Sequence, residues 1–231
     1  MPAKNSQKIY VKDGFYHLYN RGVEKRVIFE DQQDRNVFLA YLKEYLSPKD
    51  EITLQKQLSA PGMSIREKDK ILKSLRLNNF NNEIDLICYC LMPNHFHLLL
   101  KQHSENAIDI FMNSLATRYT MYFNRREKRR GPLYEGVYKA VLVETEQQLL
   151  HLTHYIHRNP LSLQGVALQN LSEQCSSYAN YINLRNTNWV QKDDILHHFS
   201  SCLPNLSYKA FVEETEDIPK SLTSILLDDA S

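Results

Sequence analysis

The 231-residue sequence lacks any apolar run close to the roughly 20 residues that a membrane-spanning helix needs. Residues 1–12 lack the apolar core of a signal peptide, and the chain shows no internal repeat or low-complexity segment. Because 42% of the residues are hydrophobic, the chain can build a real core. We therefore expect a globular, cytoplasmic protein that does not interact with a membrane.

The sequence also lacks a Cys-x-x-Cys motif and a clear excess of basic over acidic residues. The four cysteines show no Cys-x-x-Cys spacing, so we expect buried free thiols. The formal net charge is only +1, which by itself argues against a nucleic-acid partner. The charge is unevenly distributed, because basic residues crowd between residues 118 and 139 and the chain is acidic from residue 206 onward. Charge alone therefore decides neither for nor against such a partner.

Two histidines stand at the start of an expected central strand. Residues 84–91 and 96–100 are apolar and flank the turn residues Pro93 and Asn94, which predicts two adjacent antiparallel strands. The side chains of His95 and His97 would share one face, roughly 7 Å apart. This geometry lets two imidazoles bind one metal ion. Solvated or hydrogen-bonded histidines are the alternative, and the commoner outcome for an isolated His-x-His.

The remaining pattern predicts helices around one sheet. A strand over residues 14–20, which contains His17, precedes an amphipathic helix from residue 31 to Pro48. Residues 47–82 are interpreted as an insertion with a helix over 64–77, which begins at a capping box formed by Ser64 and Glu67. The later elements are a helix over 106–126, a strand over 138–143, a helix from 146 to about 158 with Thr145 as N-cap, and a short helix over 193–199.

This order of elements predicts an α+β fold, a ferredoxin/RRM-like antiparallel sheet with helices on one face. An added helix carrying Tyr155 would cover the open face, and a C-terminal extension would follow. We expect a main domain over residues 1–170, which includes the insertion 47–82. The extension over residues 171–231 would pack on this domain or trail from it.

The added helix presents a second group of polar residues. Tyr155 and Asn159 are four apart, so they lie on one helix face about 5–6 Å apart between Cβ atoms, and His151 falls on that face too. Beside His95 and His97, one amide oxygen would complete an open metal site of the catalytic type. A phenol there could attack a phosphate and form a covalent phosphotyrosine. Taken singly, Tyr155 is more often a buried aromatic residue and Asn159 a helix cap.

Three motifs together resemble a known family. The segments Tyr-His-Leu-Tyr-Asn-Arg-Gly at residues 16–22, Leu-Met-Pro-Asn-His-Phe-His-Leu-Leu at 91–99 and Tyr-Ile-His-Arg-Asn-Pro at 155–160 resemble the HUH-type single-tyrosine transposases, closest to the REP-associated tyrosine transposases of bacteria. The resemblance spans about residues 14–181, so the main domain would be the catalytic one. It implies His95, His97 and Asn159 as ligands of a divalent ion, Mg²⁺ or Mn²⁺, and Tyr155 as the nucleophile.

The sequence departs from the family pattern in two places. Val137, in a strand expected over residues 134–139, stands where relatives commonly carry arginine, and the insertion is longer than usual. The roles of His17, His154 and His157 stay open. His17 could adjoin the metal or fill the sheet.

Single-stranded or hairpin DNA is the partner that the resemblance implies. Tyr119 and Tyr122, mixed with arginines on one helix, would suit stacked bases and paired phosphates, although a core stripe with a solvated edge explains them equally well. Five of the six residues before Gly131 are Lys or Arg, more than the end of a helix needs. The candidate DNA contacts are Arg21, Arg118, Arg125, Arg126, Arg129, Arg130, Lys139 and Arg158.

The leading hypothesis is a metal-dependent transposase that nicks single-stranded DNA near a hairpin. It would form a 5′-phosphotyrosine through Tyr155, leave a free 3′-OH and rejoin strands. An HUH nuclease of plasmid replication or conjugation would share the site but differ in substrate. A domesticated relative that binds DNA without cutting it is the third hypothesis, and the intact Tyr155 and histidine pair argue against it. The sequence leaves open whether the protein is a monomer or a homodimer.

Overall fold

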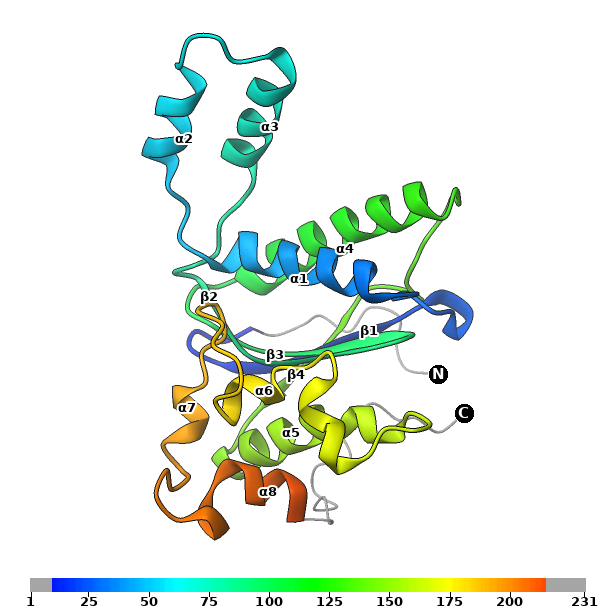
Figure 1. Cartoon of the computed structure of the whole chain (residues 1–231), viewed down its shortest axis with the longest axis vertical. Helices are drawn as coiled ribbons and strands as arrows, with labels where there is room; N and C mark the ends of the chain where they lie inside the picture. Colours follow the sequence, from blue (N-terminus) through cyan, green and yellow to red (C-terminus); the bar gives the residue numbers. More distant parts are fainter. Residues whose placement is uncertain (1–9, 215–231) are drawn as a thin grey trace.

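The two central hydrophobic segments are apolar at nearly every position, which indicates strands that are covered on both faces. They form β2 (Ile84–Met92) and β3 (His95–Gln102), joined by the expected turn at Pro93 and Asn94. With β1 (Phe15–Arg21) and β4 (Lys139–Val143) they make one antiparallel sheet in the order β2-β3-β1-β4 (Figure 1). This computed structural model describes residues 10–214.

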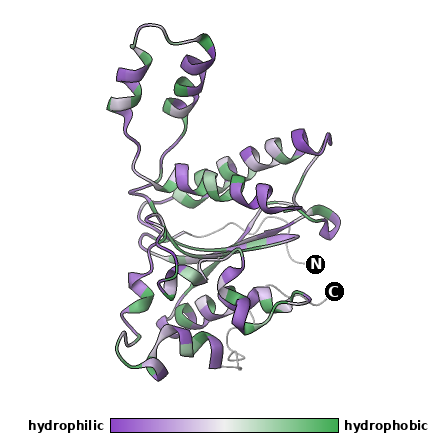
Figure 2. Ribbon diagram, viewed as in Figure 1, coloured by the Kyte–Doolittle hydropathy of each residue, from purple (hydrophilic) through white to green (hydrophobic). Residues whose placement is uncertain are grey.

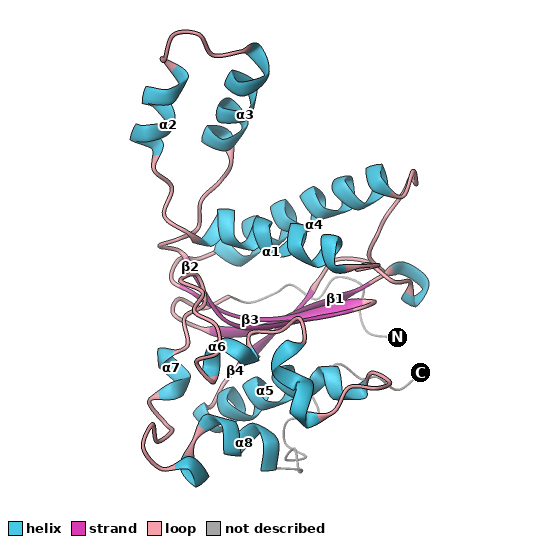
Figure 3. Ribbon diagram, in the orientation of Figure 1, coloured by secondary structure: helices cyan, strands magenta, loops and turns pink. Residues whose placement is uncertain are grey.

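Helices lie on both faces of the sheet (Figures 1 and 3). The helices α1 (Gln32–Leu46) and α4 (Ala107–Arg126) cover one face, and α5 (Glu146–Arg158) lies on the other. Each helix carries hydrophilic and hydrophobic stretches in turn, as amphipathic helices do (Figure 2). The predicted α+β fold, with two helices on one face and an added helix on the other, is confirmed. None of the described helices is both long enough and apolar enough to cross a membrane.

Local polar residues set where these elements begin and end. The Asp31 carboxylate accepts hydrogen bonds from the first turn of α1, and Thr145 forms a capping box with Gln148 at the start of α5. Gly22 follows β1, where a Cβ atom would lie only 2.3 Å from the carbonyl oxygen of Arg26. The chain can therefore turn tightly into the short 3₁₀ helix η1 (Val23–Lys25).

The insertion forms a helical hairpin that projects from the rest of the protein (Figure 1). Its second helix, α3 (Ile65–Arg76), starts at the predicted Ser64–Glu67 capping box, whereas α2 (Glu51–Leu58) was not predicted. Neither helix contains a buried residue. Lys49 ties the base of the hairpin together, because its Nζ donates to the carbonyl oxygens of Leu75 and Leu77 at 2.6 and 3.0 Å.

The chain after α5 wraps around the sheet edge and α5 in short pieces. Leu91 and Ser177 donate backbone hydrogen bonds to Cys175 and Tyr89, so this segment lies along β2. The short helix α7 is shorter than the predicted 193–199. Residues 216, 217, 228 and 229, part of the acidic tail, lie outside the described residues. The pieces are η2 (Asn159–Ser162), η3 (Leu168–Glu173), α6 (Tyr178–Tyr181), α7 (Asp193–Leu196), η4 (Pro204–Leu206) and α8 (Tyr208–Glu214).

The prediction of a strand over residues 134–139 is wrong. Tyr134 makes a single antiparallel bridge with Gly22, and the chain then runs as a loop until β4 begins at Lys139. The Asn20 side chain holds this loop by donating to the Gly136 carbonyl oxygen, which places a side chain where a strand would need a backbone partner. Val137 is 74% exposed.

A buried carboxylate joins α1 to α4. Asp34 is fully buried and accepts hydrogen bonds from the Tyr122 hydroxyl at 3.0 Å, the Glu30 backbone N–H at 2.9 Å and Arg126 Nη1 at 2.5 Å. Arg126 also pairs with Asp31 and holds the pKa of that carboxyl well below its usual range. Arg126 is therefore part of the internal packing of the two helices.

Replacing Asp34 with alanine should lower the free energy of unfolding by about 3 kcal/mol, because Arg126 and Tyr122 lose a buried acceptor. Urea denaturation followed by circular dichroism measures the change. The exposed neighbour Arg125 gives a control, since Arg125→Ala should stay within about 0.5 kcal/mol of the wild type. Equal effects of the two substitutions would contradict this role of Asp34.

Candidate active site

The strand register brings the histidines of two strands to one face of the sheet. Tyr19 lies opposite His97 and Arg21 opposite His95, so these side chains point the same way, as does that of His17. The same face receives α5, because the Tyr155 ring contacts both His97 and His17. The structure therefore gathers side chains from three segments that are far apart in the sequence.

His97 occupies the centre of this group. Its side chain is fully buried, its Nδ1 lies 2.9 Å from His17 Nε2, and the His95 ring lies 4.9 Å away between centroids. Burial, together with the two neighbouring histidines, lowers the pKa of His97 well below its ordinary value. His97 is therefore a neutral imidazole, which is the form that binds metal ions.

The ring nitrogens fit a bound divalent ion. His95 Nδ1 lies 2.6 Å from the Asn94 side-chain oxygen, and because an amide oxygen can only accept, Nδ1 carries a proton. In the neutral ring Nε2 then carries the lone pair. Within residues 10–214, His97 Nε2 is buried and makes no hydrogen bond. An unsatisfied buried nitrogen costs about 1–3 kcal/mol, which a metal ligand bond would recover. Both observations suit a pair of metal-ligating histidines.

The helix α5 brings the tyrosine to this pair. Leu152 and Ile156 bury one side of α5, and the half-buried Tyr155 points its ring edge at His97, with 5.5 Å between centroids and 87° between planes. Asn159 lies one turn further on, at the C-cap of α5, with 8% exposure. The structure thus brings His95, His97 and Tyr155 together and places His17 beside them.

The three histidines of α5 contact the C-terminal segment, and the His151 ring lies 5.7 Å from that of Phe211 between centroids. His157 donates or accepts at both ring nitrogens, with the Tyr208 hydroxyl and the Ser177 hydroxyl each at 2.7 Å, and burial lowers its pKa to about 3. His154 is buried and packs against the Phe211 ring. Both side chains face the C-terminal segment rather than the histidine pair.

Several candidate DNA contacts are engaged within the protein. Arg118 pairs with Glu44 at 2.5 Å and stacks on the Tyr41 ring, and Arg158 donates to the Val212 carbonyl oxygen. Further pairs link Arg21 to Glu135, Arg126 to Asp34, and Arg129 to Asn124.

Three candidates remain on the surface. Arg125, Arg130 and Lys139 are exposed, and the Lys139 ammonium lies over the Tyr19 ring. Tyr119 belongs to the core, because it is fully buried with its hydroxyl donating to the Ile28 carbonyl oxygen. Tyr122 is half-buried, and its hydroxyl donates to the buried Asp34 carboxylate. The surface of α4 that could meet DNA is therefore smaller than the sequence suggests.

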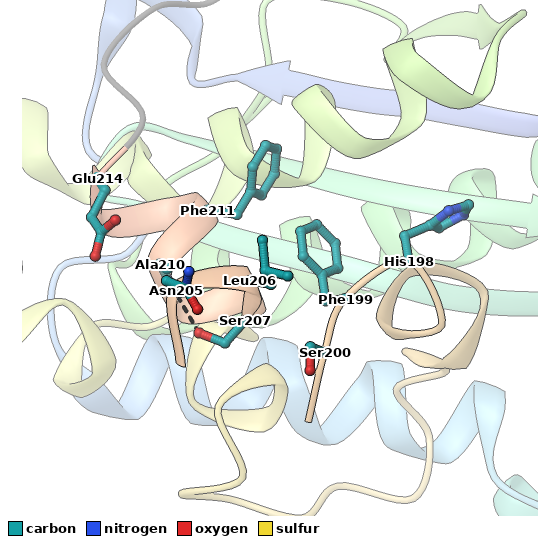
Figure 4. A pocket seen from close by; sticks show the side chains of 9 residues that line it. All are labelled: His198, Phe199, Ser200, Asn205, Leu206, Ser207, Ala210, Phe211 and Glu214. Atoms are coloured by element: carbon teal, nitrogen blue, oxygen red, sulfur yellow. Dashed lines mark hydrogen bonds between the residues drawn. The ribbon is translucent and has the colours of Figure 1, made fainter. Parts of the chain in front are cut away.

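A pocket of ≈ 590 Å³ lies in the C-terminal segment, away from this group (Figure 4). Phe199, Leu206 and Phe211 form its apolar wall, and His198 lies at one end. None of the candidate catalytic side chains lines it. The pocket is therefore separate from the histidine pair.

Comparison with known proteins agrees with the motifs. Residues 64–159 match the family described as IS200-like transposase, and this stretch contains both the histidine pair and Tyr155. The fold is similar to that of a REP-associated tyrosine transposase bound to a REP hairpin, with 9% identity, 81% of this chain and 97% of that chain covered, and a TM-score of 0.46. It is also similar to a Deinococcus radiodurans protein described as a transposase, with 15% identity, 67% and 96% covered, and a TM-score of 0.36. No curated protein has a significantly similar sequence.

His17→Ala should weaken Mn²⁺ binding by about 10- to 100-fold, because His97 loses the group that holds its Nδ1. Isothermal titration of the full chain without DNA measures the affinity. The control is His17→Gln, whose amide oxygen can accept from His97 Nδ1 and should retain most of the affinity. Unchanged binding by the alanine variant would contradict a positioning role for His17.

Proposed function

Since residues 64–159 match the IS200-like transposases, we propose that the protein is a metal-dependent single-stranded DNA endonuclease and strand transferase. The observation that carries the proposal is the contact between the Tyr155 ring and His97, at a buried pair of imidazoles. A phenol beside two metal-competent nitrogens suits phosphoryl transfer. The proposed partner is single-stranded or hairpin DNA.

The proposed chemistry exchanges one phosphate ester for another. The Tyr155 hydroxyl oxygen attacks the scissile phosphorus, loses its proton to solvent, and forms an O–P bond as the bond from phosphorus to the 3′-oxygen breaks. The 3′-oxygen takes up a proton and leaves as a free 3′-OH, and the 5′ end stays on Tyr155. Because the ester bond is conserved, a 3′-OH from another end can attack the phosphotyrosine and rejoin the strand.

The histidine pair supplies the proposed ion site. His95 and His97 would hold Mg²⁺ or Mn²⁺, with Asn159 as a third ligand. The ion would polarise a phosphate oxygen and offset the charge that develops during transfer. His17 would hold the ring of His97 in place, and the packing of α5 on β2 and β4 would hold Tyr155 against the site.

Tyr155→Phe should abolish cleavage while fold and DNA affinity survive, because the substitution keeps the ring and removes the attacking oxygen. The assay incubates hairpin-bearing single-stranded oligonucleotides with protein and Mn²⁺ and looks for a covalent adduct on a denaturing gel. Peptide mapping should place the nucleotide on Tyr155, through a 5′-phosphate. His97→Ala, which keeps Tyr155, should give no adduct, and excess chelator should have the same effect.

Other outcomes of this assay identify the alternatives. Full cleavage by the phenylalanine variant, or an adduct on Tyr122 or Tyr138, would overturn the assignment of the nucleophile. DNA binding without any adduct in the wild type would favour a non-cutting relative. Adducts formed equally well on oligonucleotides without a hairpin would favour an HUH nuclease of plasmid replication or conjugation.

The exposed arginines beside the C-terminus of α4 are the proposed phosphate contacts. Replacing Arg125 and Arg130 with alanine should weaken binding to all DNA sequences alike and reduce the salt slope by about one counterion for each arginine removed. Fluorescence anisotropy at several salt concentrations measures both effects. The variant with Lys43→Ala and Lys209→Ala removes the same charge from other surfaces and serves as the control. Equal salt slopes for the two variants would contradict a specific interaction with phosphates.

A further inference from the structure

A second group of metal-competent side chains lies at the first turn of α5. Glu146, His197 and His198 each offer one ligand atom, and these atoms all lie within 4.8 Å of one another. His198 Nε2 is 3.1 Å from a carboxylate oxygen of Glu146, and the two histidine rings lie 3.7 Å apart between centroids. The ligands therefore come from two separate segments, the start of α5 and the residues that directly follow α7.

The hydrogen bond of His197 favours the tautomer that suits metal binding. Its Nδ1 lies 3.1 Å from the carbonyl oxygen of Asp193, which can only accept a hydrogen bond. Nδ1 therefore carries the proton, and in the neutral ring Nε2 carries the lone pair. Histidine ligands of metal ions commonly have this arrangement, with one nitrogen donating to a backbone carbonyl and the other bound to the ion.

The surroundings leave room for an ion and a water molecule. A pocket of ≈ 380 Å³ is lined by all three side chains and by Phe15, Lys101 and Asp194. The cationic Lys101 pairs with Asp194 at 2.8 Å, which offsets its repulsion of a bound cation. Two imidazoles and one carboxylate, with an open position for water, are a donor set that suits tetrahedral Zn²⁺.

We propose that Glu146, His197 and His198 bind a zinc ion that fastens the C-terminal segment to the start of α5. Glu146 lies nine residues before Tyr155 on the same helix, about 13 Å along its axis, so this ion is distinct from one held by His95 and His97. The site is built from a glutamate and histidines, so it discriminates against Mg²⁺, which prefers oxygen ligands. Its existence does not depend on the proposed DNA chemistry.

The test compares zinc binding by full-length variants. Protein stripped of metal with a chelator is titrated with ZnCl₂, and bound zinc is counted after dialysis. The variant with Glu146→Gln and His197→Ala should bind one equivalent less than the wild type, or bind it at least tenfold more weakly. His97→Ala should still bind one equivalent. Zinc should also raise the melting temperature of His97→Ala, and this rise should be lost when the two substitutions are added.

The control for this titration is a substitution of His103, another histidine that lies between carboxylates. Both ring nitrogens of His103 are engaged, by Asp13 at 3.0 Å and by Asp85 at 2.7 Å, so His103→Gln should leave zinc uptake unchanged. Glu146, His197 and His103 are partly or fully exposed, so the variants at these positions should fold. Circular dichroism of the metal-free proteins checks the fold of every variant, including that of His97→Ala, whose altered side chain is buried. Equal zinc uptake by the wild type and the double variant, or no uptake by His97→Ala, would overturn the proposal.

Discussion

The candidate site depends on the register between β1 and β3. Tyr19 faces His97 across the ladder, so His17 lies diagonally beside His97 on the same face of the sheet. A shift of one residue would turn every side chain of β1 to the opposite face. Since both faces are packed, the register is strongly specified. The sheet can therefore hold His97 Nε2 buried and, within the described residues, unsatisfied, a cost that native proteins tolerate mainly where a ligand or an ion binds.

The position of the tyrosine depends on the chain that follows it. His157 of α5 bonds to the Tyr208 and Ser177 hydroxyls, and Arg158 donates to the Val212 carbonyl oxygen. These contacts fix the rotation of α5 about its axis. Because Tyr155 reaches the histidine pair from one face of the helix only, these contacts of the C-terminal segment help to set where Tyr155 points.

Local signals in the sequence were sufficient for most of the fold. The strands around Pro93 and Asn94 and the capped helix starts follow from patterns within a few residues, and the structure has them. Partners distant in the sequence could not be foreseen. Arg126 looked like a free cation in a basic run, but it pairs with Asp34, 92 residues away. His17 gave no signal beyond its place on a strand, because its role follows from the register with β3. A run of charges shows how many charges there are, not which are already paired.

The near-neutral net charge is compatible with binding a polyanion, because electrostatic attraction is local. In salt near physiological strength, exposed charges act over a Debye length of about 8 Å. The acidic residues Glu213 and Glu214 lie on α8, and α8 is separated from α4 by the sheet and α5 (Figure 1). Glu213 and Glu214 therefore have little effect on the electric field around Arg125 and Arg130. Among residues 10–214, no acidic side chain forms an ion pair with either arginine. The surface at the end of α4 thus keeps a positive potential that the sum over the whole chain conceals.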